Sequence, residues 1–247
     1  MTDRMRIKGL FFDLGGTLFR YAGRLGGGGL LHVLKTLGIE AQPEDIGRGW
    51  ASATREAGEH FGAQPYFLHR DLFQATLQNF LRGFGHELDA ELFAEFHRRQ
   101  IDALLEYMPI RDDCHATLAA LRERGLYLSI VSNIDDDYLD PIVARHGLDA
   151  RLDDWTSSEA ARSCKPDAGI YRFALEKSGL EASEVLFVGD SLQHDVAGAD
   201  AIGMRSARII EDGVTTPLTH GLAITAQPTY EIEALTQLLS IVDEANG

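Results

Sequence analysis

The chain has few cysteines, few lysines and no long apolar run. Among its 247 residues the only cysteines are Cys114 and Cys164, which form no CxxC pair, so a disulfide-built scaffold is excluded and a reducing compartment is expected. No stretch approaches the ~20 apolar residues that cross a bilayer. The first residues also lack the apolar core of a secretion signal. We therefore expect a cytoplasmic protein with no membrane partner.

Basic residues are scarce relative to acidic ones. The sequence contains 23 lysine and arginine residues against 38 aspartate and glutamate residues, which gives a formal net charge of −15. This surplus opposes binding to phosphate backbones and anionic membranes, so nucleic acid is not an expected partner. Hydrophobic residues make up 45% of the chain, which is enough to bury a full core.

Short apolar runs alternate with helical patterns over much of the chain. The runs span 9–12, 126–131, 185–188 and 207–210, and the helical patterns span 114–124, 141–145, 170–178, 195–204 and 235–242. Apolar strands that alternate with helices are typical of α/β proteins. The sequence therefore predicts a parallel sheet that is covered by helices on both sides.

The segment from Arg20 to Tyr107 differs, because it contains no strand-like run. Apolar residues recur there at spacings of three and four, as in 68–81 and 88–96. We expect a helical insert of roughly 85 residues. The four glycines at 26–29 lack the preceding strand and following lysine of a P-loop, so we expect them to form a flexible hinge into the insert.

Three of the predicted strands lead directly into a polar residue. Asp13, Ser132 and Asp190 each lie at or just beyond the carboxyl end of an apolar run. Ligands bind at the carboxyl ends of the strands in open parallel sheets. We therefore expect these three side chains to mark one functional site.

Four separated motifs resemble those of the haloacid dehalogenase-like hydrolase superfamily, in the order of that family. They are Phe12-Asp13-Leu14-Gly15-Gly16-Thr17-Leu18, Ile130-Val131-Ser132-Asn133, Lys165-Pro166-Asp167 and Gly189-Asp190-Ser191-Leu192-Gln193-His194-Asp195-Val196-Ala197-Gly198-Ala199. The resemblance implies a Rossmann-like core at 1–18 and 108–247. It also implies that residues 19–107 form an α-helical cap domain.

The resemblance assigns chemical roles to the acidic residues of these motifs. Asp13 stands where the family has a nucleophile, which attacks phosphorus and forms an aspartyl-phosphate. Asp190 and Asp195 stand where the family has metal-binding acids, so we expect Mg²⁺ to be held with Asp13 and the backbone carbonyl of Gly15. A helix N-terminal acid that only supports the metal site is the alternative for Asp195.

The other motif residues are expected to bind the phosphoryl group. Ser132 would donate a hydroxyl hydrogen bond, with Asn133 beside it, and Lys165 would offset the developing charge. The scarcity of lysines strengthens the assignment of Lys165, because the chain has only four of them. Backbone N–H groups around Gly16 and Thr17 would add an anion-binding turn.

One position departs from the family pattern. Phosphatases of this family carry a second aspartate two residues after the nucleophile, as general acid and base, whereas this chain has Gly15. Such assistance is worth about 10²–10⁴ in rate. Water activation would then come from the insert, from a good leaving group or from solvent. His60 and His69 lie in the insert and could carry protons there, but we expect both to lie on the surface.

The main hypothesis is a Mg²⁺-dependent phosphatase that acts on a small phosphorylated metabolite. Gly15 keeps three alternatives open: a phosphate-binding pseudoenzyme or regulatory module, a phosphonate-cleaving enzyme, and a 2-haloacid dehalogenase. The phosphonatase would need a Schiff-base lysine in the insert, where Lys35 is the only one. A dehalogenase needs no proton donor for the halide, but relatives of that kind lack the full set of metal-binding acids.

Some other features have simpler interpretations. The nine histidines show no metal-ligand spacing, so a zinc site is not expected. We expect residues 135–137, three consecutive aspartates, to cap a helix. The oligomeric state is not predicted by any pattern in the sequence.

Overall fold

The computed structural model describes residues 6–20, 27–62, 64–211 and 226–247. The chain divides into two compact units: residues 1–21 with 109–247, and residues 22–108. The first unit contains the whole sheet, and the second contains only helices among its described residues.

The first unit is built on a six-stranded sheet with the order β3-β2-β1-β4-β5-β6. All neighbouring strands pair in parallel, which confirms the predicted fold class. The strands are β1 (Gly9–Phe12), β2 (Tyr127–Ser132), β3 (Asp154–Ser157), β4 (Val185–Gly189), β5 (Arg205–Ile209) and β6 (Tyr230–Ile232).

The strand order reverses between β1 and β4. Strands β2 and β3 follow β1 toward one edge, and β5 and β6 follow β4 toward the other. All four residues of β1 are buried, as expected for a central strand with both faces covered. Phe12 lies opposite Ile130 on one side and Val188 on the other, so the carboxyl ends of these three strands lie within two residues of one another.

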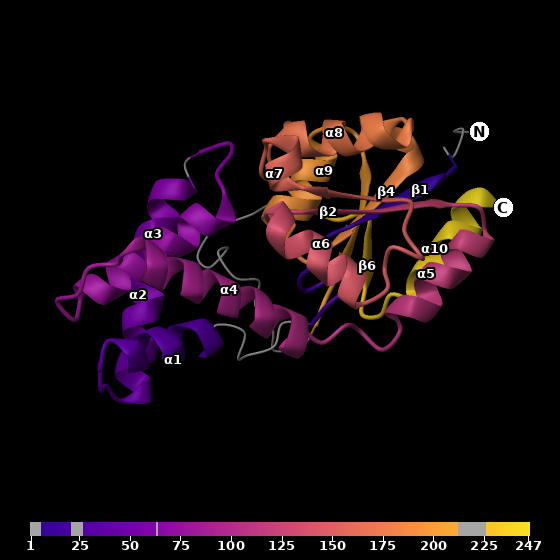
Figure 1. The fold of residues 1–247 in the computed structure, drawn as a ribbon. Helices are drawn as coiled ribbons and strands as arrows, with labels where there is room; N and C mark the ends of the chain where they lie inside the picture. Colours follow the sequence, from indigo (N-terminus) through magenta and orange to yellow (C-terminus); the bar gives the residue numbers. More distant parts are fainter. Residues whose placement is uncertain (1–5, 21–26, 63, 212–225) are drawn as a thin grey trace. The chain divides into compact units, whose positions relative to one another are not determined.

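Helices cover both faces of the sheet (Figure 1). One face carries α7, α8 and α9, and the other carries α5, α6 and α10. Their bounds are α5 (Cys114–Glu123), α6 (Asp136–Arg145), α7 (Ser158–Ala161), α8 (Ala168–Ser178), α9 (Gly198–Asp200) and α10 (Gln237–Asn246), and a short 3₁₀ turn, η1 (Ala182–Glu184), precedes β4.

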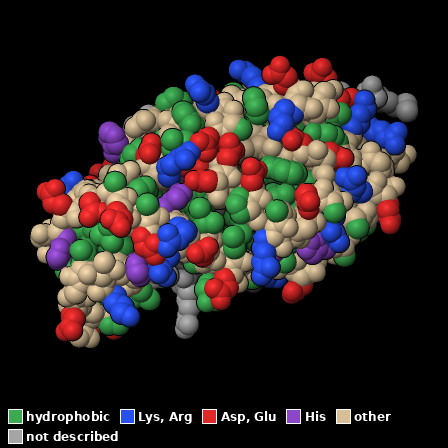
Figure 2. All heavy atoms as spheres, viewed as in Figure 1, with side chains coloured by type: hydrophobic (Ala, Val, Ile, Leu, Met, Phe, Trp, Pro, Cys, Tyr) green, Lys and Arg blue, Asp and Glu red, His purple; other side chains and the backbone are tan. Residues whose placement is uncertain are grey.

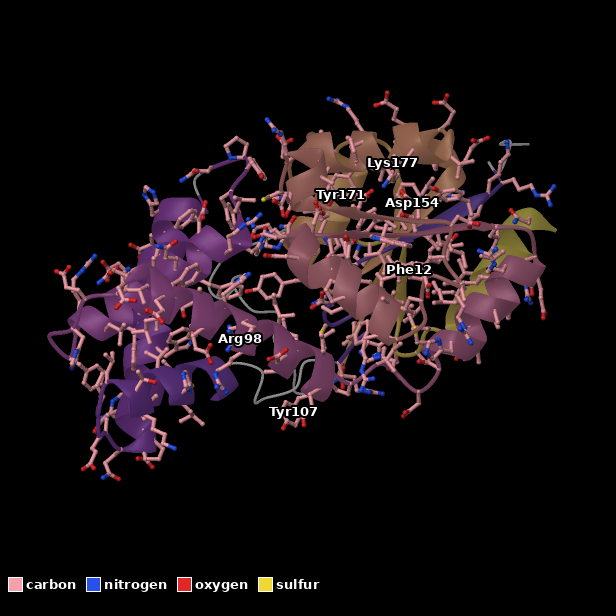
Figure 3. All side chains as sticks on the ribbon, viewed as in Figure 1. Phe12, Arg98, Tyr107, Asp154, Tyr171 and Lys177 are labelled. Atoms are coloured by element: carbon pink, nitrogen blue, oxygen red, sulfur yellow. The ribbon has the colours of Figure 1, made fainter. Side chains whose placement is uncertain are left out.

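Helix α8 illustrates how local sequence sets these bounds. The Asp167 side chain accepts a hydrogen bond from the backbone N–H of Gly169 at 2.8 Å and so caps the helix start. Gly179 ends the helix with a φ of 69°, a conformation that glycine adopts without strain. Lys177 forms a 2.6 Å ion pair with Asp154, which ties α8 to β3 (Figure 3).

Several elements differ from the sequence prediction. Strands β3 and β6 were not predicted, because they are short and carry polar residues among their apolar ones. The helix expected at 195–204 is instead a π-helical turn, η2 (Leu192–Ala197), followed by α9, which ends at Asp200. Helix α6 begins at Asp136 rather than Pro141, and Asp135 occupies its N-cap position.

The second unit contains four helices among its described residues. They are α1 (Gly27–Thr36), α2 (Pro43–Phe61), α3 (His69–Arg82) and α4 (Ala90–Tyr107). The apolar faces of α3 and α4 match the spacings seen in the sequence, and they enclose a core of their own that includes Phe80 and Phe96. The expected glycine hinge is wrong in part, because residues 27–29 form the first turn of α1, while Gly26 lies outside the described residues.

Charge is dispersed rather than gathered on the visible face of the molecule. Figure 2 shows acidic side chains interspersed there with lysine and arginine side chains, although the net charge is −15. Cys114 and Cys164 are both buried, and no disulfide joins them. Within the described ranges, no helix is both long and apolar enough to cross a membrane.

Two glycines of α2 offer a matched test of packing in the second unit. A methyl group at Gly47 would meet nothing within 4 Å, whereas one at Gly49 would lie 3.1 Å from the ring of buried Phe80. Alanine favours a helix over glycine by about 1 kcal/mol. We expect Gly47→Ala to raise the free energy of unfolding by about that amount. Gly49→Ala should gain less, because Phe80 must shift.

Urea denaturation followed by Trp50 fluorescence measures both changes, because Trp50 packs against Phe80 with ring centroids 5.7 Å apart. Equal gains from the two substitutions would contradict this packing.

Candidate active site

The carboxyl ends of β1, β2 and β4 hold the residues that the sequence singled out. Asp13 follows β1, Ser132 ends β2, and Asp190 follows β4. The backbone N–H of Asp13 donates to the carbonyl of Val188 at 2.8 Å, which continues the pairing of β1 and β4 past the last strand residue. The site therefore forms where the strand order reverses, which is the usual ligand position in such sheets.

Lys165 joins two of the carboxylates. Its ammonium group lies 2.6 Å from Asp13 Oδ1 and 2.6 Å from Asp195 Oδ1, and its side chain is 2% exposed. The Ser132 hydroxyl also donates to Asp13 Oδ1, at 3.1 Å. The ring of Phe187 lies 5.3 Å from the ammonium nitrogen, a distance that allows a cation–π contact. One oxygen of Asp13 thus receives two hydrogen bonds, which orient the carboxylate.

Asn133 holds the backbone of Lys165 from both sides. Its side-chain Nδ2 donates to the Lys165 carbonyl at 2.9 Å, and its Oδ1 accepts from the Lys165 N–H at 2.6 Å. This pair of bonds connects the end of β2 to the segment before α8. Asn133 therefore positions Lys165, and its expected contact with a substrate stays a prediction.

Three carboxylates converge around this lysine. Asp13, Asp190 and Asp195 each offer an oxygen, and these oxygens lie within 4.8 Å of one another. Burial raises the pKa of Asp195, and Asp13 and Asp190 also raise it, while Lys165 opposes the rise. Burial by itself would lower the pKa of Lys165, but Asp13 and Asp195 raise it overall. The cluster carries more negative charge than one ammonium offsets, so it could hold a divalent cation.

The η2 turn places Asp195 under the end of β4. Asp195 Oδ2 accepts a hydrogen bond from the backbone N–H of Ser191 at 2.9 Å, and the Ser191 hydroxyl accepts one from the His194 N–H at 3.1 Å. Gly189 makes room for this arrangement, since a Cβ there would lie 2.3 Å from Asp195 Cγ. Both oxygens of Asp195 are therefore engaged, one by Lys165 and one by Ser191.

The turn after Asp13 contains the remaining predicted residues. Gly16 adopts a φ of 78°, which favours glycine. Thr17 is fully buried, and within the described chain its hydroxyl has no hydrogen-bond partner. Gly15 is half-buried and pairs by a single bridge with Phe19. The roles expected of the Gly15 carbonyl and of the Gly16–Thr17 backbone stay predictions.

Most of the chain matches a known protein family. The sequence pattern of the haloacid dehalogenase-like hydrolases fits residues 7–203. The chain belongs to that family. The suspected resemblance is confirmed, and the protein is a hydrolase.

Relatives of this hydrolase include a phosphatase and a dehalogenase. Ribulose-1,5-bisphosphate 5-phosphatase of Halopiger xanaduensis is 26% identical over 237 residues, which cover 94% of this chain and 98% of that protein. (S)-2-Haloacid dehalogenase of Pseudomonas sp. (strain YL) is 27% identical over 248 residues, covering 98% and 97%. In structure, the HAD-hydrolase YfnB from Bacillus subtilis matches with a TM-score of 0.76 at 20% identity, covering 96% of this chain and 99% of that one, which supports the fold.

Three residues around the site of this hydrolase were given no role from the sequence. Ser191 was quoted within a motif, and its position before a helical turn is a recognisable capping signal. Tyr171 is buried in α8 (Figure 3) and donates its hydroxyl hydrogen to the His194 carbonyl, and burial raises its pKa. Arg208 of β5 donates from Nε to the Asp190 carbonyl at 3.2 Å. No local pattern indicates the last two contacts.

A second acidic cluster lies outside this site. Asp135, Asp137 and Glu159 offer oxygens within 4.8 Å of one another. Asp135 and Asp137 belong to the expected capping run and stand at the start of α6, where the helix dipole favours acidic residues.

Gly189→Ala tests the close approach of Asp195 to β4. The new methyl group would overlap the Asp195 carboxylate, which must move away from Lys165 and Ser191. Overpacking at a buried position costs about 1–3 kcal/mol. We expect a loss of that size in the free energy of unfolding, measured by denaturation and followed by Trp155 fluorescence in the sheet. Gly47→Ala adds the same methyl group where nothing lies within 4 Å, so as the control it should show no loss of stability. An unchanged stability for Gly189→Ala would contradict the described geometry.

Proposed function

We propose that this protein is a Mg²⁺-dependent phosphohydrolase that acts on a small phosphorylated metabolite. The observation that supports this most strongly is the convergence of three carboxylates around one buried lysine. A carboxylate that displaces a halide from carbon needs no cation, so three converging acids favour phosphoryl transfer over dehalogenation. The similarity to a phosphatase over nearly the whole chain agrees with this choice.

The residues fit a hard divalent cation that prefers oxygen ligands. Asp13 and Asp190 would bind it directly with the carbonyl of Gly15. Asp195, whose oxygens already bond Lys165 and Ser191, would support the site from behind. When bound, Mg²⁺ would supply Lewis-acid polarisation of the phosphoryl group and would offset its charge.

Asp13 is arranged to act as a nucleophile. Its Oδ1 is held by Lys165 and Ser132, whereas no hydrogen bond to its Oδ2 occurs within the described chain. One oxygen is thus fixed in place while the other can attack phosphorus and form an aspartyl-phosphate. Ser132 and Lys165 would bind the phosphoryl oxygens, and the buried Thr17 hydroxyl with the Gly16 backbone would complete an anion-binding turn.

The domain boundaries and the cellular location are part of the same proposal. We place the core at residues 1–18 and 108–247 and the cap, which would select the substrate, at residues 19–107. The acidic charge and the small-molecule site suit a cytoplasmic enzyme that acts on metabolites rather than on nucleic acid.

Asp13→Asn tests the nucleophile. An amide cannot form the acyl-phosphate, so phosphate release from 4-nitrophenyl phosphate in the presence of Mg²⁺ should fall to the uncatalysed background. Asp149→Asn changes an exposed acid and should keep the activity of the unmodified protein. Metal-independent halide release from a 2-haloacid would contradict the phosphatase proposal in favour of a dehalogenase. Release from a phosphonate but not from phosphate esters would favour a phosphonatase.

Asp190→Asn tests the metal site without relying on turnover. Loss of one charged ligand should weaken Mg²⁺ binding at least about tenfold, as measured by calorimetry or by the Mg²⁺-dependent rise in melting temperature. Asp149→Asn again serves as the control. Equal Mg²⁺ affinity in Asp190→Asn and the unmodified protein would remove Asp190 from the metal site.

A further inference from the structure

Position 15 carries no side chain, although its backbone does not demand glycine. Gly16 has a φ of 78°, but Gly15 is not among the described glycines with positive φ. An ordinary residue could therefore adopt the conformation of residue 15 without strain of this kind. The backbone conformation of the turn therefore does not require glycine at position 15.

The groups that contact Asp13 are committed to other partners. The Lys165 ammonium bonds two carboxylates, and the Ser132 hydroxyl donates to Asp13 itself. The nearby Tyr171 hydroxyl donates to the backbone carbonyl of His194. Residue 15 offers no acid. Lys165 and Ser132 hold Asp13 and would bind the transferring phosphoryl oxygens, and the Tyr171 hydroxyl is bonded to a backbone carbonyl. The described core therefore holds none of these groups ready to protonate a departing oxygen.

We infer that the site selects phosphorylated compounds whose leaving group departs as a stable anion. This inference rests on the proposed phosphohydrolase function. The substrates are phosphoryl derivatives of acidic hydroxyl groups, such as acyl, enol and aryl phosphates. Esters of simple alcohols are poor substrates, because an alkoxide needs a proton as it leaves.

The reaction balances without a proton donor in the first step. Asp13 Oδ2 forms a bond to phosphorus, the bond from phosphorus to the leaving oxygen breaks, and its electron pair departs on a carboxylate, enolate or phenolate. Water then attacks the phosphorus of the aspartyl-phosphate. The bond to Asp13 breaks, the carboxylate is regenerated, and dihydrogen phosphate leaves and loses a proton to solvent.

A series of phosphates with graded leaving groups tests this selectivity. The compounds are acetyl phosphate, 4-nitrophenyl phosphate, phenyl phosphate and benzyl phosphate, assayed with Mg²⁺. We expect kcat/KM to fall steeply along this order. Gly15→Asp supplies the absent acid, and Gly15→Asn is its control, because an amide of the same shape cannot act as an acid.

Gly15→Asp should raise the ratio of the benzyl to the 4-nitrophenyl kcat/KM by about 10²–10⁴-fold, and Gly15→Asn should leave that ratio near its original value. Equal hydrolysis of benzyl and 4-nitrophenyl phosphate by the unmodified protein would overturn the inference, since another proton donor must then operate. Equal ratios in the two variants would also overturn it. If Gly15→Asp does not fold, as judged by circular dichroism, the series of phosphates assayed with the unmodified protein still tests the inferred selectivity.

Failure of the underlying function gives a different result. No phosphate release from any compound by the unmodified protein, including acetyl phosphate, would reject the phosphohydrolase proposal itself. Turnover that appears only in Gly15→Asp would reject it in favour of a phosphate-binding pseudoenzyme.

Discussion

The buried ion pairs of Lys165 are the constraint on which the site depends. An ammonium group and a carboxylate each lose several kcal/mol of hydration when they are buried, and only close pairing offsets this cost. Lys165 meets Asp13 and Asp195 at 2.6 Å each, with nearly no solvent exposure of the lysine or of Asp195. If one partner were removed, the others would be left as uncompensated charges. The loops after β1 and β4 and the segment before α8 are therefore held together by electrostatics as well as by the sheet.

The topology of the sheet explains why this charge cluster forms at one point. Strands β1 and β4 are neighbours in space but are separated by more than 170 residues of sequence. Because they are parallel and in register, their carboxyl ends bring Asp13 and Asp190 to the same edge. The Asn133 side chain then fixes the lysine segment to β2 through two hydrogen bonds. A surplus of negative charge at a strand-order reversal is a suitable setting for a cation and a phosphoryl group.

Three glycines serve this site in different physical ways. Gly189 lacks a Cβ because the Asp195 carboxylate occupies that space, and Gly16 adopts a left-handed φ that closes the turn. Gly15 is not among the described glycines with positive φ, and in our proposal its effect is that position 15 provides no proton donor. Replacing each glycine therefore acts on a different property: packing, backbone conformation or chemistry.

Much of the fold could be predicted from the sequence, because short stretches of neighbouring residues specify many of its strands and helices. The fully buried strands β1 and β4 are continuous apolar runs, and α3, α4, α5 and α8 show clear helical spacing. Strands β3 and β6 were missed, since each is an edge strand of only three or four residues and needs little apolar character. The glycines at 27–29 were also predicted wrongly, for a different reason. Their helical conformation depends on the packing of α1 within its unit, which the neighbouring residues do not specify.

By itself the sequence determined the motifs, the alternation of strands and helices and the placement of Asp13, Ser132 and Asp190 at strand ends. Three contacts were decided only by the tertiary structure. The Asn133 amide hydrogen-bonds the Lys165 backbone, and Asp195 lies beneath Gly189. Arg208 hydrogen-bonds the Asp190 carbonyl. The reason is physical. Strand and helix propensities act between residues a few positions apart, whereas these contacts join residues brought together by strand order and by the burial of charge.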